Sequence, residues 1–255
     1  MDKKVLDIIT INLDNKEGLE LTIKSVINQT FFDIVNFIII DGDSKDGSKE
    51  LIEEYNDRLF HWVSEKDNGI YNAMNKGIEA SVSPYCLFLN SGDYLSDKKR
   101  LETIFPYLDG KWDLVYCDEY KKHKENEKIK DPFEWCKGQF IYKFYTHNKW
   151  HIHNPLGELS KYPDELTEEF FENMALPHQS TFIKTKLLKK HPYDENYKII
   201  SDWKFLREAW ADGCKYIHVP IPMSVFNLDG FSVHNLQLMW DEKKDYYSNL
   251  NLLNK

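Results

Sequence analysis

The stretch Val35–Glu50, VNFIIIDGDSKDGSKE, decides the fold, because an apolar run ends abruptly in acids and glycines. An apolar run without regular polar alternation is typical of a parallel strand that is covered on both faces. The glycines allow a tight turn, and Ser48 can cap the helix that follows. Neither role explains Asp41, which directly follows three isoleucines. A carboxylate at this strand tip would face a ligand crevice and could accept hydrogen bonds from a nucleobase imide or a ribose hydroxyl.

Strand and helix patterns alternate on both sides of this stretch. Short β-rich runs predict strands, and apolar faces with helical spacing predict helices. The expected strands are 5–11, 35–40, 59–64, 85–89 and 113–117, and the expected helices include 19–27 and 70–81. This order predicts an α/β fold with a Rossmann-like, mostly parallel sheet and helices on both faces. In such a sheet, ligands bind beyond the carboxyl ends of the strands.

The regular alternation stops at Tyr120. From Tyr120 to His153 the chain is rich first in lysine and then in aromatic residues. This composition fits either a solvated loop or hairpin, or a cationic and aromatic surface for an acceptor or for membrane headgroups. Beyond it the patterns predict a strand and short helix at 180–191, a helix at 201–213, a proline-interrupted edge strand at 216–226 and a helix from Leu236.

Charge and composition argue against several classes of protein. The formal net charge of −9 over 255 residues disfavours a nucleic-acid partner, which needs a concentrated basic surface. The four cysteines are far apart and form no C-x-x-C pair, so we expect structural thiols in a reducing compartment. No apolar run reaches the length of a membrane span or fits a signal peptide, so we expect a cytoplasmic protein.

Acids recur at the ends of three successive expected strands. Asp41 follows the second strand, Glu65 and Asp67 follow the third, and Asp93 follows the fourth. Carboxylates gathered at one edge of a sheet repel one another. A divalent cation, or the hydrogen-bond donors of a polar ligand, would relieve that repulsion. The chain contains neither a G-x-x-x-x-G-K-[ST] phosphate loop nor a G-x-G-x-x-G dinucleotide turn.

Seven segments, in this order, resemble glycosyltransferase family 2, the inverting nucleotide-sugar transferases with a GT-A fold. The segments are IITINLDN, SVINQTF, FIIIDGDSKDGS, SEKDNGIYNAMNKGI, YCLFLNSGDYL, PHQSTF and SDWKFLREA. The chain most resembles the small bacterial members that build surface polysaccharides such as O-antigen, capsule or exopolysaccharide. The resemblance implies one GT-A domain over residues 1–255, with a nucleotide-sugar-binding half at 1–118, an acceptor-binding half at 119–235 and a C-terminal helix at 236–255.

The resemblance implies a donor-binding set in the first half of the chain. Asp41 matches the position that recognises uridine, and Asp67 matches a second acid that approaches the base or the ribose. Lys76 matches a helix position beside the donor diphosphate, although a solvated helix lysine explains it equally well. The full implied set is Ile11, Asn12, Asp41, Asp43, Ser44, Asp67, Lys76, Asn90, Ser91 and Gly92.

Asp93 occupies the last position of the family's metal-binding Asp-x-Asp. This chain has Ser91 at the first position, and a serine is a poor metal ligand. Coordination would therefore rest on Asp93, the donor diphosphate, water and one later side chain, for which His234 in a C-terminal loop is the candidate. Hard oxygen ligands of this kind favour Mn²⁺ or Mg²⁺.

Asp202 matches the family's catalytic acid at the start of a helix. In that role it would act as general base and remove a proton from the acceptor hydroxyl during attack on the anomeric carbon. A helix cap at Ser201 or Asp202 is the plainer alternative. His178 and Gln179 match an acceptor-binding position.

The sequence therefore predicts an inverting, metal-dependent glycosyltransferase that moves a hexose or N-acetylhexosamine from a UDP-sugar. The family's usual setting implies a lipid-diphosphate-linked saccharide as acceptor and peripheral contact with the cytoplasmic face of the inner membrane. Two alternatives stay open: a nucleotidyltransferase of similar fold, and a non-catalytic nucleotide- or saccharide-binding module. A nucleotidyltransferase would want a basic, glycine-rich loop near the start of the chain, where NLDNKEG offers one lysine and one glycine.

Overall fold

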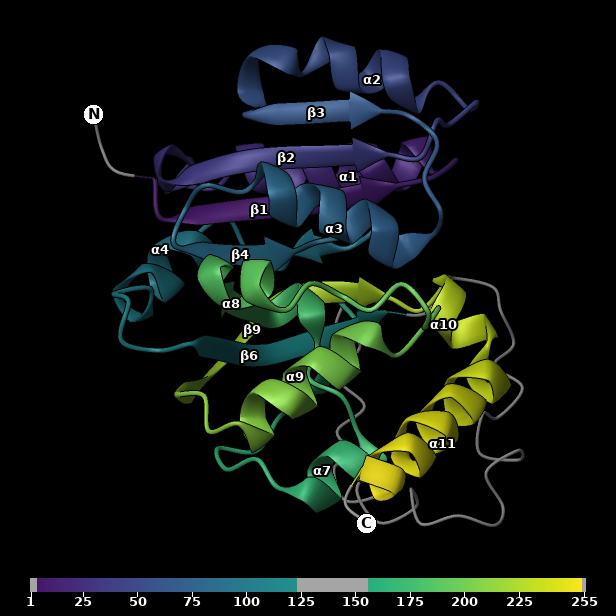
Figure 1. The fold of residues 1–255 in the computed structure, drawn as a ribbon. Helices are drawn as coiled ribbons and strands as arrows, with labels where there is room; N and C mark the ends of the chain where they lie inside the picture. Colours follow the sequence, from purple (N-terminus) through teal and green to yellow (C-terminus); the bar gives the residue numbers. More distant parts are fainter. Residues whose placement is uncertain (1–3, 123–155, 254–255) are drawn as a thin grey trace.

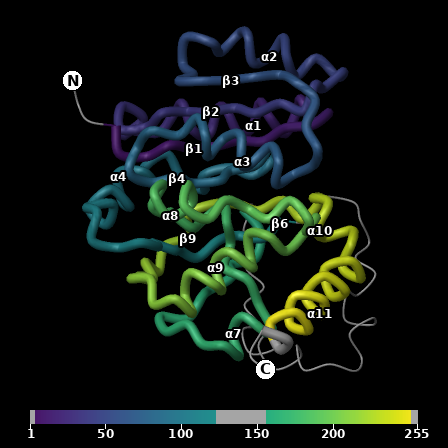
Figure 2. The backbone as a smooth tube through the Cα atoms, in the orientation of Figure 1, coloured from purple at the N-terminus to yellow at the C-terminus, as the bar shows by residue number. Residues whose placement is uncertain are grey.

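The computed structural model describes residues 4–122 and 156–253 of the chain (Figure 1). Most of the segment from Tyr120 to His153, with both of its interpretations, lies outside these residues. Figure 2 shows the first half of the chain packed along the second, and together they form one continuous sheet. The strand order is β3-β2-β1-β4-β8-β6-β9-β5, and β7 pairs with β6.

The stretch Val35–Glu50 contributes an inner strand to the parallel half of the sheet. β2 (Val35–Asp41) lies between β1 (Leu6–Asn12) and β3 (His61–Ser64), and β4 (Tyr85–Phe88) pairs with the other side of β1. All of these pairings are parallel, as an apolar run without polar alternation predicts. Their carboxyl ends therefore meet at one edge, on the right in Figure 1.

The other half of the sheet mixes strand directions. β8 (Thr181–Lys184) pairs antiparallel with both β4 and β6 (Leu114–Lys122), while β9 (Tyr216–Asn227) pairs parallel with β6. The short strands β5 (Tyr94–Leu95) and β7 (Glu158–Ser160) are antiparallel to their partners β9 and β6.

The proline-interrupted strand lies next to the edge of the sheet rather than at it. β5 pairs with Ser224 and Val225 of β9, so the expected edge position is corrected for this end of the strand. Pro220 and Pro222 lie where the register with β6 shifts around Asp118. A bulge accommodates residues that cannot donate a ladder hydrogen bond, which is why the strand continues through both prolines.

Helices cover both faces of the sheet, as the sequence predicts. Buried side chains form one apolar core with α3, α8 and α9, and a second core with α1, α2 and α4 on the opposite face. β1 serves both cores, because Ile8 and Ile9 point to opposite faces. The helices are α1 (Lys16–Ile27), α2 (Ser48–Glu54), α3 (Ile70–Ala80), α4 (Arg100–Ile104), α7 (Glu168–Asn173), α8 (Thr185–Lys190), α9 (Ser201–Ala211), α10 (Phe231–His234) and α11 (Leu236–Leu253), with 3₁₀ turns at 32–34, 56–58, 105–107 and 178–180.

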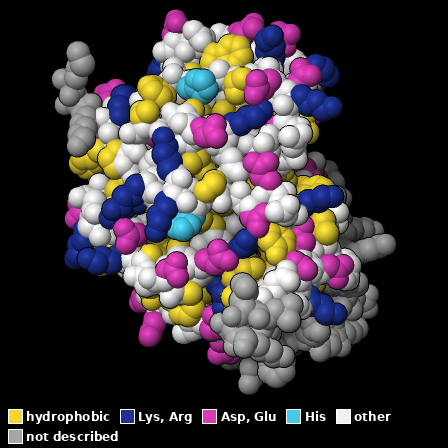
Figure 3. Space-filling model, in the orientation of Figure 1, with side chains coloured by type: hydrophobic (Ala, Val, Ile, Leu, Met, Phe, Trp, Pro, Cys, Tyr) yellow, Lys and Arg dark blue, Asp and Glu magenta, His cyan; other side chains and the backbone are white. Residues whose placement is uncertain are grey.

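Three of the four cysteines are described, and each is a free thiol: Cys86, Cys117 and Cys214. Within residues 4–122 and 156–253, no helix combines the length and the apolar character needed to cross a membrane. On the face shown in Figure 3, acidic and basic side chains are interspersed.

Candidate active site

A pocket of about 650 Å³ lies beyond the carboxyl ends of β1 and β4. Its walls come from the start of α1, the first turns of α3, the turn after β4, the loop that enters α9 and the segment that follows β9. Asp93 and Asp202, which are far apart in the sequence, both line it. A cavity of this size with a few convergent polar groups is typical of a small-molecule site.

Asp93 is a nearly buried carboxylate in the turn after β4. Its Oδ1 accepts a hydrogen bond from the backbone N–H of Asn227 at 3.0 Å, and its residue surface is 6% exposed. Burial raises the pKa of Asp93 to about 7, although the Asn227 hydrogen bond and the nearby His178 act in the opposite direction. The site therefore holds a carboxylate whose negative charge lacks full compensation.

Helix α1 fixes the turn that carries this carboxylate. The Thr22 hydroxyl donates to the carbonyl oxygen of Asp93 at 2.7 Å, and the Gly92 N–H donates back to the Thr22 oxygen at 3.0 Å. Gly92 has φ of +102°, a conformation that residues with a side chain rarely adopt. The glycine is thus required by the backbone of the turn, whatever the turn binds.

Asp202 lies at the start of α9 and accepts hydrogen bonds on both carboxylate oxygens. Oδ2 lies 2.9 Å from His178 Nδ1, while Oδ1 accepts from the Trp203 N–H at 2.9 Å and lies 2.7 Å from the Tyr71 hydroxyl, whose single proton is shared with the Ile199 carbonyl oxygen at 2.5 Å. Burial alone would raise the pKa of Asp202, but the hydrogen bond and charge of His178, with the Tyr71 hydroxyl, hold it below its usual value. Asp202 is therefore kept ionised in a site that would otherwise favour the neutral acid.

His178 is engaged at both ring nitrogens. Nε2 lies 3.1 Å from Nδ2 of Asn90, and Nδ1 faces Asp202. Burial alone would lower the pKa of His178, but the hydrogen bond and charge of Asp202 raise it above its usual value. The contacts join the end of β4 to the first residues of α9.

The residues at Asp93 offer a partial fit to a divalent cation. Asn90 Oδ1 is buried without a hydrogen-bond partner among the described residues, and the Asp93 carboxylate lies nearby in the chain with a raised pKa. Such oxygens suit Mg²⁺ or Mn²⁺. Within the described part of the chain, no group of three His, Cys, Asp or Glu side chains could hold a metal, so a bound ligand would have to complete the coordination.

Ser91, at the first position of the family's metal motif, lines the same pocket as Asp93, whereas the predicted later ligand His234 does not. Ser91 lies beside Asn15, whose Nδ2 donates to the Ser91 carbonyl oxygen at 3.0 Å. The ring of His234 lies 3.5 Å from Asp229 and does not line the pocket, although Asp229 does.

Asp41 is buried and accepts hydrogen bonds from three side chains and one backbone N–H. Asn12 Nδ2 and the Ser44 hydroxyl donate to Oδ1 at 2.7 and 2.5 Å, and the Ser64 hydroxyl and Ser44 N–H donate to Oδ2 at 2.7 and 3.1 Å. The structure thus brings together Asn12, Asp41 and Ser44 of the predicted donor set. It adds Ser64, to which the sequence assigned no role.

The remaining predicted donor residues lie along the same edge of the sheet. Asp67 accepts from the Gly69 N–H at 2.9 Å at the entrance to α3 and packs closely against Gly42. Lys76 forms an ion pair with Glu65 at 2.7 Å. Of the ten predicted donor residues, Asn90, Ser91 and Gly92 line the 650 Å³ pocket, while Ile11, Asn12, Asp41, Asp43, Ser44, Asp67 and Lys76 do not.

Gln179 does not line the pocket, unlike its neighbour His178. Its Nε2 donates to Glu119 at 2.8 Å, and both side chains are buried. Glu119 also accepts from the Tyr162 hydroxyl at 2.8 Å. Gln179 therefore belongs to a buried polar cluster with Glu119 and Tyr162.

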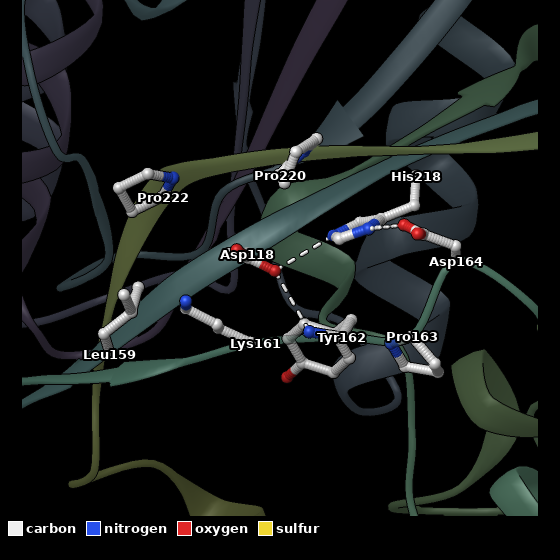
Figure 4. A pocket seen from close by; sticks show the side chains of 9 residues that line it. All are labelled: Asp118, Leu159, Lys161, Tyr162, Pro163, Asp164, His218, Pro220 and Pro222. Carbon is white, nitrogen blue, oxygen red and sulfur yellow. Dashed lines mark hydrogen bonds and ion pairs between the residues drawn. The ribbon is translucent and has the colours of Figure 1, made fainter. Parts of the chain in front are cut away.

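A second cavity, of about 480 Å³, lies over β6, β7 and β9 (Figure 4). His218 bridges two carboxylates there, with Nε2 3.0 Å from Asp118 and Nδ1 2.7 Å from Asp164. Asp118 also accepts from the Tyr162 N–H at 3.0 Å. These contacts tie β9 and the loop after β7 to β6, and they explain the polar groups of this cavity as links between strands.

Several of these contacts join residues that no local pattern connects. Tyr71 is the second residue of α3, and nothing around it in the sequence signals its contact with Asp202. Asn227 and Ser64 act through hydrogen bonds to acids in other strands or turns. A hydrogen-bond network of this kind becomes visible only once the elements are packed.

Comparison with known proteins gives one family. The model of the family described as Glycosyl transferase family 2 matches residues 7–163. An uncharacterized glycosyltransferase of Methanocaldococcus jannaschii is 25% identical over 268 aligned positions, which cover 98% of this chain and 84% of the relative. The abequosyltransferase RfbV of Salmonella typhimurium is 26% identical over 228 positions, which cover 87% of this chain and 61% of RfbV.

Solved structures with the same fold include two enzymes captured with nucleotide sugars. S. aureus TarS 1-349 in complex with UDP-GlcNAc superimposes with a TM-score of 0.64 at 15% identity, over 91% of this chain and 61% of that solved fragment. The mannosyltransferase PcManGT of Pyrobaculum calidifontis, in complex with GDP-Man and Mn²⁺, gives 0.62 at 13% identity, over 91% of this chain and 59% of PcManGT. The chain thus spans about 60% of the length of these solved chains, and the likeness confirms the GT-A fold.

Proposed function

The chain belongs to glycosyl transferase family 2, and from this premise we propose that it transfers a hexose or N-acetylhexosamine from a UDP-sugar to a saccharide acceptor, with inversion. The observation that carries the proposal is the convergence of Asp93 and Asp202 on one 650 Å³ pocket. Asp93 would lie near the diphosphate of the donor, and Asp202 would remove a proton from the acceptor.

The donor would lie along the edge where the parallel strands end. The cluster around Asp41 would hold the nucleoside, with Asp67 beside it, and the turn Asn90–Gly92 would lie under the diphosphate. TarS binds UDP-GlcNAc and PcManGT binds GDP-Man with the same fold, which supports a nucleotide-sugar donor. UDP is proposed because Asp41 matches the family's uridine-recognising position. Since protein donors fill the acceptor directions of Asp41, its role would be to fix Asn12, Ser44 and Ser64 around the nucleoside.

Asp93 is the residue proposed to hold Mn²⁺ or Mg²⁺ together with the donor diphosphate. A bound cation would neutralise charge that develops on the leaving nucleoside diphosphate. The partial fit of the protein ligands makes the diphosphate a necessary part of this site. The proposal therefore predicts that the metal binds weakly to the protein alone and more tightly when UDP is present.

Asp202 is proposed as the general base. Its carboxylate takes the proton from an acceptor hydroxyl while that oxygen forms a bond to the anomeric carbon. The bond from the anomeric carbon to the diphosphate oxygen breaks on the opposite side, and the electron pair leaves with the nucleotide. A single displacement of this kind inverts the anomeric centre.

The acceptor is proposed to be a growing surface saccharide, linked to a lipid diphosphate. Support comes from the relative RfbV, an abequosyltransferase, and from another relative, the minor teichoic acid biosynthesis protein GgaB of Bacillus subtilis. Lys122 and Lys198 line the pocket, and cationic side chains suit a phosphate-bearing ligand. A cytoplasmic location at the inner membrane face belongs to the same proposal.

The proposal is tested by incubating the protein with Mn²⁺ and a panel of UDP- and GDP-sugars, and measuring release of the nucleoside diphosphate. We expect slow hydrolysis of one UDP-sugar in the absence of acceptor. Binding of UDP without turnover of any donor would instead favour a binding module. Formation of a nucleotide-sugar from a nucleoside triphosphate and a sugar phosphate would identify a nucleotidyltransferase.

A further inference from the structure

The ring of His178 is held from two sides. Nδ1 faces the Asp202 carboxylate at 2.9 Å, and Nε2 faces the Asn90 amide at 3.1 Å. A carboxylate only accepts hydrogen bonds, so Nδ1 carries the proton of that contact. With both nitrogens engaged, the ring has no atom left to bind an acceptor hydroxyl directly, which was the role implied by the family resemblance.

Asp202 has most of its hydrogen-bonding positions filled. Oδ1 accepts from the Trp203 N–H and shares the hydroxyl proton of Tyr71 with the Ile199 carbonyl oxygen, whereas Oδ2 accepts from His178. A carboxylate offers about four lone-pair directions, so one direction on Oδ2 remains. Because Asp202 lines the pocket, that lone pair is available to an acceptor hydroxyl.

From these contacts we propose that His178 is a positioning residue, which donates Nδ1–H to Oδ2 of Asp202 and so directs the remaining lone pair of Oδ2 toward the acceptor hydroxyl. The role rests on the proposed function of Asp202 as general base. Asn90 holds the far side of the ring and thereby links the base to the turn that carries Asp93. The pocket thus aligns its donor and acceptor ends through one chain of side chains.

The charges around His178 are consistent with this role. Three carboxylates act on the ring, Asp202 from α9, Asp93 from the turn after β4 and Glu119 from β6. Donation from the ring keeps Asp202 ionised against the cost of burial, and an acid that stays ionised can accept a proton. Loss of the donor should therefore impair the base without altering donor binding.

Three substitutions of His178 separate positioning from other roles. His178→Asn places an amide N–H close to the position of Nδ1, where it can still donate to Asp202. His178→Gln places its amide N–H near the position of Nε2, and His178→Ala removes both. The Asn and Gln variants are a matched pair, because both keep a polar amide and differ in which contact they can reproduce.

The experiment measures kcat and KM for the donor turned over by the wild-type protein, together with the Kd of UDP. We expect His178→Ala and His178→Gln to lower kcat by about 10- to 100-fold, as is usual for residues that orient a functional group, with little change in the Kd of UDP. The acid limb of the pH–kcat profile should move to higher pH in both. His178→Asn should recover most of kcat and return the limb toward its original position.

Two results would overturn the role of His178. One is an unchanged kcat with a raised KM for the donor, which would make His178 a binding residue. The other is equal activity of the Asn and Gln variants. Thermal unfolding of all three variants excludes loss of fold as the cause, and the Asn–Gln comparison holds if His178→Ala fails to fold.

A second readout does not depend on turnover. In ¹⁵N-histidine NMR of the wild-type protein, the His178 signal, assigned by its loss in His178→Asn, should show a protonated Nδ1 that Asp202→Asn perturbs. A wild-type protein that hydrolyses no nucleotide sugar would contradict the proposed function, while this signal still tests the contact. An Nδ1 without a proton would contradict the positioning role itself.

Discussion

At the scale of single residues, Asp93 combines burial with an acidic group. Its pKa of about 7 in the folded chain lies above the ordinary value of 3.8 that the unfolded chain would show. An acid with a raised folded pKa favours folding in its neutral form, so stability falls as pH rises from about 4 through 7. The buried charge then costs up to about 4 kcal/mol above pH 7, at 1.36 kcal/mol per pKa unit.

We therefore predict that Asp93→Asn stabilises the protein in the absence of metal and nucleotide, and does so more strongly at high pH. The gain in the free energy of unfolding should increase by about 3 kcal/mol between pH 5 and pH 8. Urea unfolding at the two pH values measures it, with the exposed Asp33→Asn as control. A gain that is the same at both pH values would show that burial of charge is not its cause.

At the scale of elements, the approach of α3 to the sheet depends on a glycine. A Cβ at Gly77 would lie 2.4 Å from Cγ2 of Ile9 in β1, closer than side chains tolerate. α3 carries both Tyr71, which contacts Asp202, and Met74, which lines the pocket. The close packing of this helix on β1 therefore helps to define the active-site wall.

Gly77→Ala should destabilise the protein by about 1 to 2 kcal/mol, because overpacking outweighs the higher helix propensity of alanine. Gly230→Ala is the matched control, since nothing lies within 4 Å of a Cβ at that position. Combination with Ile9→Ala should be less destabilising than the sum of the single changes. Additive effects in urea unfolding would refute the contact as the cause.

The long C-terminal helix buries a lysine against aromatic rings. Lys243 is 6% exposed, lies 4.4 Å from the centre of the Trp203 ring, and donates to the Phe171 carbonyl oxygen at 3.3 Å. Burial lowers the pKa of Lys243 to about 8 from its usual 10.5. The charged form therefore costs stability below pH 8, and this cost disappears as pH rises toward 10.5.

Lys243→Met should raise the free energy of unfolding at pH 7 by about 1 to 3 kcal/mol, after the loss of the Phe171 hydrogen bond and the contact with Trp203. The gain should shrink when unfolding is measured at pH 10. Lys244→Met, on the exposed side of the same helix, serves as control. A destabilised Lys243→Met would mean that the contacts of the ammonium group outweigh its burial.

Elements with a strong local pattern could be predicted from the sequence, and contacts between distant residues could not. Residues 35–40 and 70–81 carry their periodicity within one window, so β2 and α3 were expected close to where they lie. The pairing of β5 with β9 rests on two residues of each strand and gives no such signal. The candidate site was reached through the family resemblance, while the links Tyr71–Asp202 and Asn90–His178 depend on tertiary packing.

At the scale of the whole molecule, the two expected halves share one sheet. β4 pairs with β8 and β5 pairs with β9, so strands of the first half complete the second half. The division at residue 118 also falls within β6, which runs from Leu114 to Lys122. Neither half can bury its sheet edge without the other, and one domain over the whole chain stays a prediction.

We predict that the chain unfolds in a single cooperative transition. Far-ultraviolet circular dichroism, tryptophan fluorescence and calorimetry should give coincident midpoints. The fragment 1–118 should fail to fold by itself because it lacks β8, which pairs with the side of β4 opposite to β1. A fragment with native-like stability, or separate transitions for the two halves, would contradict the shared sheet.

The role of Asp202 as general base is the central claim of the proposed mechanism. The most direct test measures nucleoside diphosphate release from the preferred UDP-sugar, with the Kd of UDP, in the wild-type protein and in Asp202→Asn. Loss of a general base should slow turnover by about 10²- to 10⁴-fold and leave the Kd of UDP nearly unchanged, because the proposed role of Asp202 is with the acceptor and not with the nucleotide. Full turnover in Asp202→Asn, or parallel loss of turnover and UDP binding, would contradict it.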